Sequence, residues 1–137
     1  MGYAIRRSSV ILCFPLLLAA SAPCAAELSD SELATFRKEL KARADLTVRR
    51  LRAMPGVTCV PPAAAFYAMP RIALPPGRTD EHYVKALLHA TGVLCVYGSG
   101  FGLPAEEGFL RIVFLAPLNE LTEIYDLMSS FTAQYFS

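Results

Sequence analysis

The sequence predicts one small α+β domain in two layers, with helices packed on one face of a mostly antiparallel sheet. Three segments carry apolar residues at helical spacing, short β-type runs lie between them, and proline and glycine make the connections short. The resulting order is α-β-β-α-β-β-α. With 137 residues, of which 54% are hydrophobic and 18% charged, the chain is long enough for one modest core and is not of a disordered type.

The first predicted helix covers residues 29–53. Ser29 and Glu32 have the spacing of a capping box, which satisfies free amides of the first turn, and Pro55-Gly56 stops the helix. Its basic residues fall mostly off the apolar stripe, so we interpret them as a solvated face and not as a phosphate-binding patch. The stripe that we expect to face the core consists of Leu33, Phe36, Leu40, Ala44, Thr47, Val48 and Leu51.

Two extended segments follow, at 57–60 and at 65–69, with Phe66 and Tyr67 expected on opposite sides of the second one. A second helix is expected to start at Thr79 or Asp80 and to run to about residue 90. Gly92 fits the left-handed position that ends such helices.

The last part of the chain predicts two strands and a helix. The strands cover 93–97 and 109–115 and flank a glycine-containing loop at 98–108. Asn119 is expected to cap the final helix. Its core positions are Leu121, Ile124, Met128, Phe131 and Tyr135.

Charge and cysteine content exclude several classes of function. The net charge of +1 gives no electrostatic reason to expect nucleic acid as a partner. The cysteines lack paired spacing, so we expect no metal site. Cys59 and Cys95 lie in apolar runs and read as small buried hydrophobes, and a disulfide between them would require a secreted protein.

Residues 1–28 form an apolar N-terminal segment with two interpretations. Arg6 and Arg7 precede the apolar stretch 10–18, and small residues follow up to Ala26, a pattern typical of a secretory signal peptide cleaved after Ala26. Buried strands and small-residue helices of a large α/β enzyme are also apolar, so the segment is alternatively a remnant of a larger domain.

Arg111 is the residue whose placement hints at a substrate. It is a lone positive charge inside an apolar strand, so it must reach an anion or project into water. A planar guanidinium can clamp a carboxylate through two parallel hydrogen bonds, whereas an arginine on an edge strand would face solvent. We interpret His82 and His89 as surface residues and the pair at 106–107 as solvated carboxylates.

The loop Gly98-Ser99-Gly100-Phe101-Gly102 could cradle a phosphate with its backbone amides, but it lacks the lysine and the following helix of the known phosphate loops. Together with its surroundings it has a different meaning. The run 92–102, followed by 108–112, resembles the late signature of class I/II aminotransferases, "gV-x-V-x-P-G-S-x-F-G" and then "R-I". Upstream, 55–57 and 62–67 resemble the family's "P-G-(V/I)" and "P-x-G-A-F-Y". The resemblance covers residues about 30 to 135.

The resemblance implies that residues 29–137 form the C-terminal small domain of a pyridoxal-phosphate-dependent aminotransferase. Arg111 then corresponds to the arginine that binds the substrate α-carboxylate, and Gly98, Ser99 and Gly102 shape the adjoining loop. The sequence departs from the family pattern at two positions, where Tyr97 replaces the usual proline and Ala64 the usual glycine.

The resemblance also implies which parts of the family's site are missing from this sequence and which partners would supply them. Residues 1–4 resemble the family's "G-W-R-x-G-Y-A" entered after its arginine, so the blocks carrying the cofactor lysine and the phosphate-binding arginine are missing. We therefore expect no catalytic residue here and no covalently bound pyridoxal phosphate. The implied partners are an amino acid or 2-oxo acid, a large cofactor-binding domain and, in the parent family, a second subunit.

Three readings of the isolated chain remain open at this point. It is an aminotransferase part, cytoplasmic by family resemblance and inactive alone; or an exported, non-catalytic carboxylate-binding or interaction module with a cleaved signal peptide; or a truncated product whose exposed sheet face promotes aggregation.

Overall fold

The computed structural model describes residues 29–136, so the predicted segment 1–28 lies outside the described residues. Two 3-10 turns, η1 at Gly98–Phe101 and η2 at Ala105–Glu107, lie in the loop between β4 and β5. The helices and strands are α1 Asp30–Arg52, β1 Val57–Cys59, β2 Tyr67–Ala68, β3 Pro70–Ile72, α2 Asp80–Thr91, β4 Val96–Tyr97, β5 Leu110–Val113 and α3 Leu118–Tyr135.

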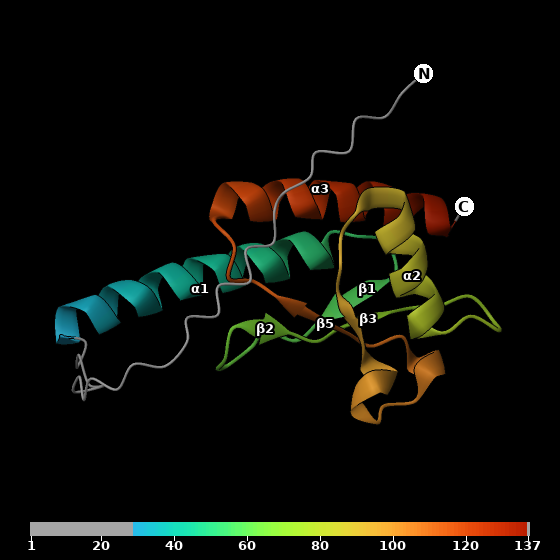
Figure 1. Cartoon of the computed structure of the whole chain (residues 1–137), viewed down its shortest axis with the longest axis horizontal. Helices are drawn as coiled ribbons and strands as arrows, with labels where there is room; N and C mark the ends of the chain where they lie inside the picture. The colour runs from blue at the N-terminus through green and yellow to red at the C-terminus, as the bar shows by residue number, and fades with distance from the viewer. Residues whose placement is uncertain (1–28, 137) are drawn as a thin grey trace, which may run out of the picture.

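The elements form the predicted α+β arrangement, in which the helices lie over one side of small antiparallel sheets (Figure 1). β1 pairs with β3, and β5 pairs with β2 on one side and β4 on the other. A single antiparallel bridge between Arg71 and Phe109 connects the two sheets. β5 is therefore the central strand of its sheet.

The strands differ from the prediction in two respects. The extended segment expected at 65–69 ends at Ala68, and β3 begins at Pro70, a strand that the sequence pattern did not predict. The chain leaves β5 at Met69 and pairs with β1 instead, so the stretch belongs to two sheets. The expected strand at 93–97 is paired only at Val96 and Tyr97.

Side-chain capping is found at the N-terminus of two of the three described helices. Ser29 and Glu32 form the predicted capping box, with Ser29 N–H donating to Glu32 Oε2 at 2.8 Å. Thr79 caps α2, and Gly92 ends it with φ of 78°. The prediction of Asn119 as the cap of α3 was wrong, because Pro117 holds that position. A proline there has no N–H to leave unsatisfied and its φ is already fixed.

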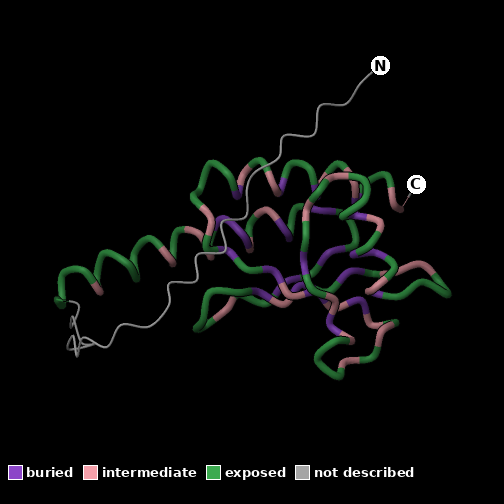
Figure 2. Tube along the Cα trace, in the orientation of Figure 1, coloured by how far each residue is buried: buried purple, intermediate pink, exposed green. Residues whose placement is uncertain are grey.

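The first half of α1 extends beyond the rest of the domain (Figure 1), and Figure 2 shows it almost wholly exposed. Phe36, expected on the core side, is 49% exposed. The buried part of the helix begins at Leu46, where α1 reaches α3 and β1. Helical spacing alone could not reveal where the partner surface ends.

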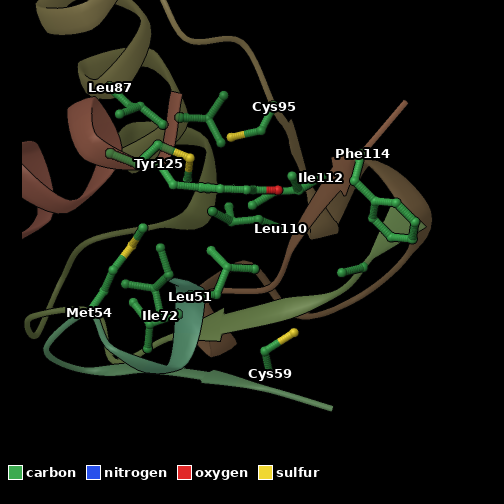
Figure 3. Packing of buried hydrophobic residues seen from close by; sticks show 14 of the residues in the cluster. Leu51, Met54, Cys59, Ile72, Leu87, Cys95, Leu110, Ile112, Phe114 and Tyr125 are labelled. Atoms are coloured by element: carbon green, nitrogen blue, oxygen red, sulfur yellow. The ribbon is translucent and has the colours of Figure 1, made fainter. Parts of the chain in front are cut away.

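The core lies between the helices and the inner face of the sheets, and Figure 3 shows helix and strand side chains meeting in one cluster. Leu110 and Ile112 of β5 point into it from the sheet side. Cys59 and Cys95 are free and buried, as predicted. Burial raises the pKa of the Cys95 thiol to about 12. None of the described helices has the length and apolar character needed to cross a membrane.

Two buried tyrosine–threonine pairs tie the helices together. Tyr125 of α3 meets Thr47 of α1 with 2.8 Å between the hydroxyl oxygens, and Tyr83 of α2 meets Thr132 of α3 at 2.7 Å. Each threonine hydroxyl also lies within hydrogen-bond distance of the carbonyl one turn earlier in its own helix and donates to it. The tyrosine hydroxyl must therefore be the donor in each pair.

Candidate functional site

Arg111 lies on the outer face of the sheet in its central strand. Leu110 and Ile112 on either side of it are 1% and 7% exposed, so strand alternation turns Arg111 away from the core. Its backbone partner is Val96 of β4, and β2 covers the other edge of β5. The alternative of an edge-strand arginine is therefore wrong, because β5 has a neighbour on both sides.

Two aromatic rings hold the Arg111 guanidinium. Its Cζ lies 4.4 Å from the ring centroid of Phe101 and 5.7 Å from that of Tyr67, both within cation–π distance. The rings are themselves 50% and 38% exposed. The Nε atom of Arg111 is buried and has no hydrogen-bond partner among residues 29–136, and none of the ion pairs in that range includes Arg111.

Arg71 provides a contrast within the same layer. Its Cζ lies 5.9 Å from the ring centroid of Phe109, a similar cation–π contact. Its Nε, however, donates to the backbone carbonyl of Glu107 at 2.9 Å. Arg71 is therefore satisfied by the chain itself, whereas the buried Nε–H of Arg111 has no acceptor among residues 29–136.

The loop residues that the sequence predicts beside the site use their amides within the chain. Gly98 donates its N–H to the carbonyl of Phe109 at 2.7 Å, and Gly102 donates to the carbonyl of Ser99 at 3.1 Å. A Cβ on Gly98 would lie 2.8 Å from that Phe109 oxygen, and Gly102 has φ of 84°, so both positions require glycine. Because the Gly98 and Gly102 amides already donate to carbonyls of the chain, these two positions do not support the phosphate-cradle interpretation of the loop.

Asp80 is a functional candidate that sequence reasoning missed. Its side chain is fully buried at the start of α2, and it contacts Ser99 in the loop at 98–108. Oδ2 accepts from the Ser99 N–H at 2.6 Å, and Oδ1 accepts from the Ser99 hydroxyl at 2.9 Å and from the Glu81 N–H at 2.7 Å. An aspartate at a helix start is ordinarily read as a cap, and no local pattern reveals a partner 19 residues away.

A groove of about 460 Å³ lies between residues 91–96, β5 and α3. Arg111 is the charged residue on its wall, and the remainder is largely apolar, including Leu94 and Leu127, which are 72% and 47% exposed. The apolar lining also includes Val96 and Val113, which are 38% and 46% exposed.

The other titratable candidates are surface groups. His82 is exposed and lies within hydrogen-bond distance of Arg78 and of the Tyr135 hydroxyl, at 2.7 and 2.9 Å. Among the described residues no three acidic, histidine or cysteine side chains converge to hold a metal. The lysines of the sequence lie exposed on α1 and α2, at Lys38, Lys41 and Lys85.

Comparisons with known proteins identify the family to which the chain is similar. The family model for class I and II aminotransferases matches residues 4–126. Human alanine aminotransferase 1 is 34% identical over 107 residues, which is 71% of this chain and 22% of that protein. The aspartate/prephenate aminotransferase of Cereibacter sphaeroides is 42% identical over 80 residues, 52% of this chain and 20% of that protein.

A solved structure is similar as well. The alanine aminotransferase from Pyrococcus furiosus superimposes with a TM-score of 0.71 at 38% identity, covering 76% of this chain and 26% of that one. The chain thus spans about a fifth to a quarter of the length of these proteins.

Proposed function

Because the chain belongs to the family of class I and II aminotransferases, we propose that residues 29–137 form a substrate-carboxylate-binding small domain in which Arg111 binds the α-carboxylate of an amino acid or 2-oxo acid. One observation carries this proposal. Arg111 is a half-buried cation with a buried, unpartnered Nε–H and with no counter-anion among the described residues. A buried charge left in this state is costly unless a ligand completes it.

The geometry favours a planar, bidentate anion. The guanidinium presents Nε–H and one Nη–H as parallel donors along one edge, which match the two oxygens of a carboxylate. The Phe101 ring lies with its centroid 4.4 Å from the Arg111 Cζ, so it blocks the approach of a ligand from that side. Amino acids and 2-oxo acids share this carboxylate, and both are accommodated by the same contact.

Pyridoxal phosphate is the cofactor of the family and supplies the electron sink for amino-group transfer when it is bound. The described residues do not fit its covalent attachment. The lysines lie on exposed helix surfaces, and two of them, Lys41 and Lys85, are in ion pairs with carboxylates one turn away. We propose that this chain contributes substrate binding, is inactive alone, and depends on a cofactor-bearing part supplied by residues outside it.

The outer face of the sheet is where we propose that this cofactor-bearing part docks. Tyr67, Val96 and Val113 expose between 38% and 46% of their surface there, beside Arg111. Covering this apolar surface would also exclude water from the carboxylate site and strengthen the ion pair.

NMR of the arginine Nε–H groups tests the carboxylate site directly on the 137-residue chain. Titration with L-alanine should shift the Arg111 Nε–H signal and leave that of Arg71 in place, because Arg71 Nε already donates to a carbonyl. Alaninol, which lacks the carboxylate, should shift neither signal. Arg111→Lys should weaken L-alanine binding about tenfold to hundredfold, the loss expected for a charge-assisted bidentate contact. Equal shifts of both arginine signals would mean general ionic association and would reject the assignment.

The expected inactivity is tested separately. The chain, mixed with pyridoxal phosphate, L-alanine and 2-oxoglutarate, should form pyruvate no faster than the same mixture without protein. Turnover above this background that disappears in Arg111→Lys would show that the chain is a complete catalyst and would overturn this part of the proposal.

A further inference from the structure

We propose that Asp80 is a positioning residue for the carboxylate site: it holds the turn at 98–102 so that Phe101 stays on the Arg111 guanidinium. This inference rests on the proposed function for its ligand, and on the geometry of the described residues for everything else.

The carboxylate of Asp80 is committed to the turn. It is fully buried and accepts hydrogen bonds from the N–H and the hydroxyl of Ser99 at 2.6 and 2.9 Å. A buried carboxylate is tolerated only when it is paired in this way, and its place at the N-terminus of α2 adds the favourable helix dipole. The helix itself does not need these two bonds, because Thr79 already caps it through the His82 N–H.

The turn transmits this anchor to the aromatic ring. Ser99 and Phe101 belong to the same 3-10 turn, η1, so fixing the backbone at Ser99 also fixes where the Phe101 side chain starts. A further hydrogen bond fixes the turn at Ser99, because the Ser99 carbonyl accepts from the Gly102 N–H at 3.1 Å. Asp80 thus acts on Arg111 indirectly. It fixes the backbone of the turn, and the turn fixes the Phe101 ring that contacts the guanidinium.

Half of the Phe101 surface is exposed, so its ring can move away from Arg111 when the turn loosens. The Arg111 backbone is fixed by pairing with β4, but its side chain is long and flexible. Without Phe101, Tyr67 at 5.7 Å is the remaining aromatic contact, and the ligand must contribute more to ordering the guanidinium. Ordering one such side chain on binding corresponds to a loss of about threefold to tenfold in affinity.

Asp80→Asn tests the inference, because the amide has nearly the same shape but has lost one of the two acceptor oxygens that bind Ser99. Without ligand, the ring-current shift that Phe101 imposes on the Arg111 side-chain protons should shrink. With ligand, L-alanine binding should weaken about threefold to tenfold. In a Phe101→Leu background the same substitution should cause no further loss, since the ring through which Asp80 acts is gone. An equal loss in both backgrounds, or an unchanged ring-current shift, would overturn the inference.

Two further variants separate positioning from general destabilisation. Thr79→Ala removes the cap of the same helix without touching the turn, so it should lower stability while leaving the Arg111 ring-current shift and L-alanine affinity unchanged. Ser99→Ala keeps the backbone bond to Asp80 and loses only the hydroxyl bond, so it should reduce the ring-current shift partially. Should Asp80→Asn not fold, Ser99→Ala carries the test, and no change in its ring-current shift would count against the inference.

The failure of the proposed function is distinguishable from the failure of this inference. If L-alanine never shifts the Arg111 Nε–H signal in the unmodified chain, the carboxylate site is refuted. The ligand-free ring-current measurement would still decide whether Asp80 positions Phe101 on Arg111.

Discussion

The Thr47–Tyr125 pair provides a sharp test of how the helices are held. The Thr47 hydroxyl donates to the carbonyl of Arg43 and accepts from the Tyr125 hydroxyl. The two hydroxyl oxygens are 2.8 Å apart, in a fully buried contact between α1 and α3. Burial raises the pKa of Tyr125 to about 12, so its hydroxyl is a neutral donor at ordinary pH. The two partners are therefore not equivalent, and their removal should not cost the same.

The magnitudes follow from what each substitution leaves behind. Thr47→Val keeps the shape but strands the buried Tyr125 hydroxyl, which should cost about 1–3 kcal/mol. Tyr125→Phe leaves Thr47 bonded to the Arg43 carbonyl and should cost about 1 kcal/mol, the net value of one neutral hydrogen bond. The double variant strands no group, so it should be more stable than Thr47→Val alone.

Urea unfolding measures these differences. Thr47→Val should lower the urea midpoint by about 1 M with an unchanged slope, and adding Tyr125→Phe should raise the midpoint again. A double variant whose loss equals the sum of the two single losses would refute the reasoning, because it would mean that the two hydroxyls do not interact. The equivalent pair, Tyr83 with Thr132, offers an independent repeat on α2 and α3.

Three further outcomes are expected. Gly98→Ala should destabilise the chain by about 1–3 kcal/mol, because its Cβ would lie 2.8 Å from the Phe109 carbonyl oxygen. The control Gly100→Ala should change stability by less than about 0.5 kcal/mol in the same urea assay, because its Cβ would meet only the edge of a tyrosine ring at 3.3 Å. Ala65→Gly should stabilise by about 0.5–1 kcal/mol, because Ala65 has φ of 67°, and an unchanged or lower urea midpoint would contradict this. Burial raises the pKa of Cys95 from 9.0 to about 12, so the stability contributed by the neutral thiol is complete below about pH 9 and is lost as the pH rises through about 12; unfolding curves at increasing alkaline pH should show this decline, less steeply in Cys95→Ala.

The sequence predicted best what is decided locally. The capping box at Ser29 and the left-handed Gly92 depend on neighbours within one helical turn, and both are found as expected. The missed strand β3 is different, because residues 67–72 pair first with β5 and then with β1. Which partner a strand takes is a tertiary decision, and no period-2 pattern over so few residues encodes it.

The site divides in the same way. A lone arginine in an apolar strand was enough to single out Arg111, because the cost of an unpaired charge is a property of the residue and its immediate surroundings. The role of Asp80 was not visible, because its partner Ser99 lies across the fold on another element. Phe101 was seen only as part of a loop pattern, and its contact with the guanidinium depends on the turn that Asp80 holds.

Under the proposed function, the site around Arg111 is incomplete without its ligand, and Arg111 is not a satisfied structural arginine. A structural arginine in this layer has a solution available, which Arg71 shows by donating its Nε–H to a backbone carbonyl. Arg111 has instead an aromatic ring at 4.4 Å and a buried Nε–H with no acceptor among residues 29–136. An aromatic ring fixes the orientation of a guanidinium without occupying its N–H donors. The Arg111 donors are therefore oriented but unsatisfied, which lowers the free energy of unfolding of the ligand-free chain. Leaving a donor unsatisfied costs on the order of 1–3 kcal/mol, which binding of a carboxylate would recover.

Arg111→Met, which keeps the apolar stem and removes the charge, should therefore leave the ligand-free chain as stable or more stable while abolishing the response to L-alanine. A strong loss of stability in this variant would show that Arg111 serves the fold and would remove the physical basis for the site.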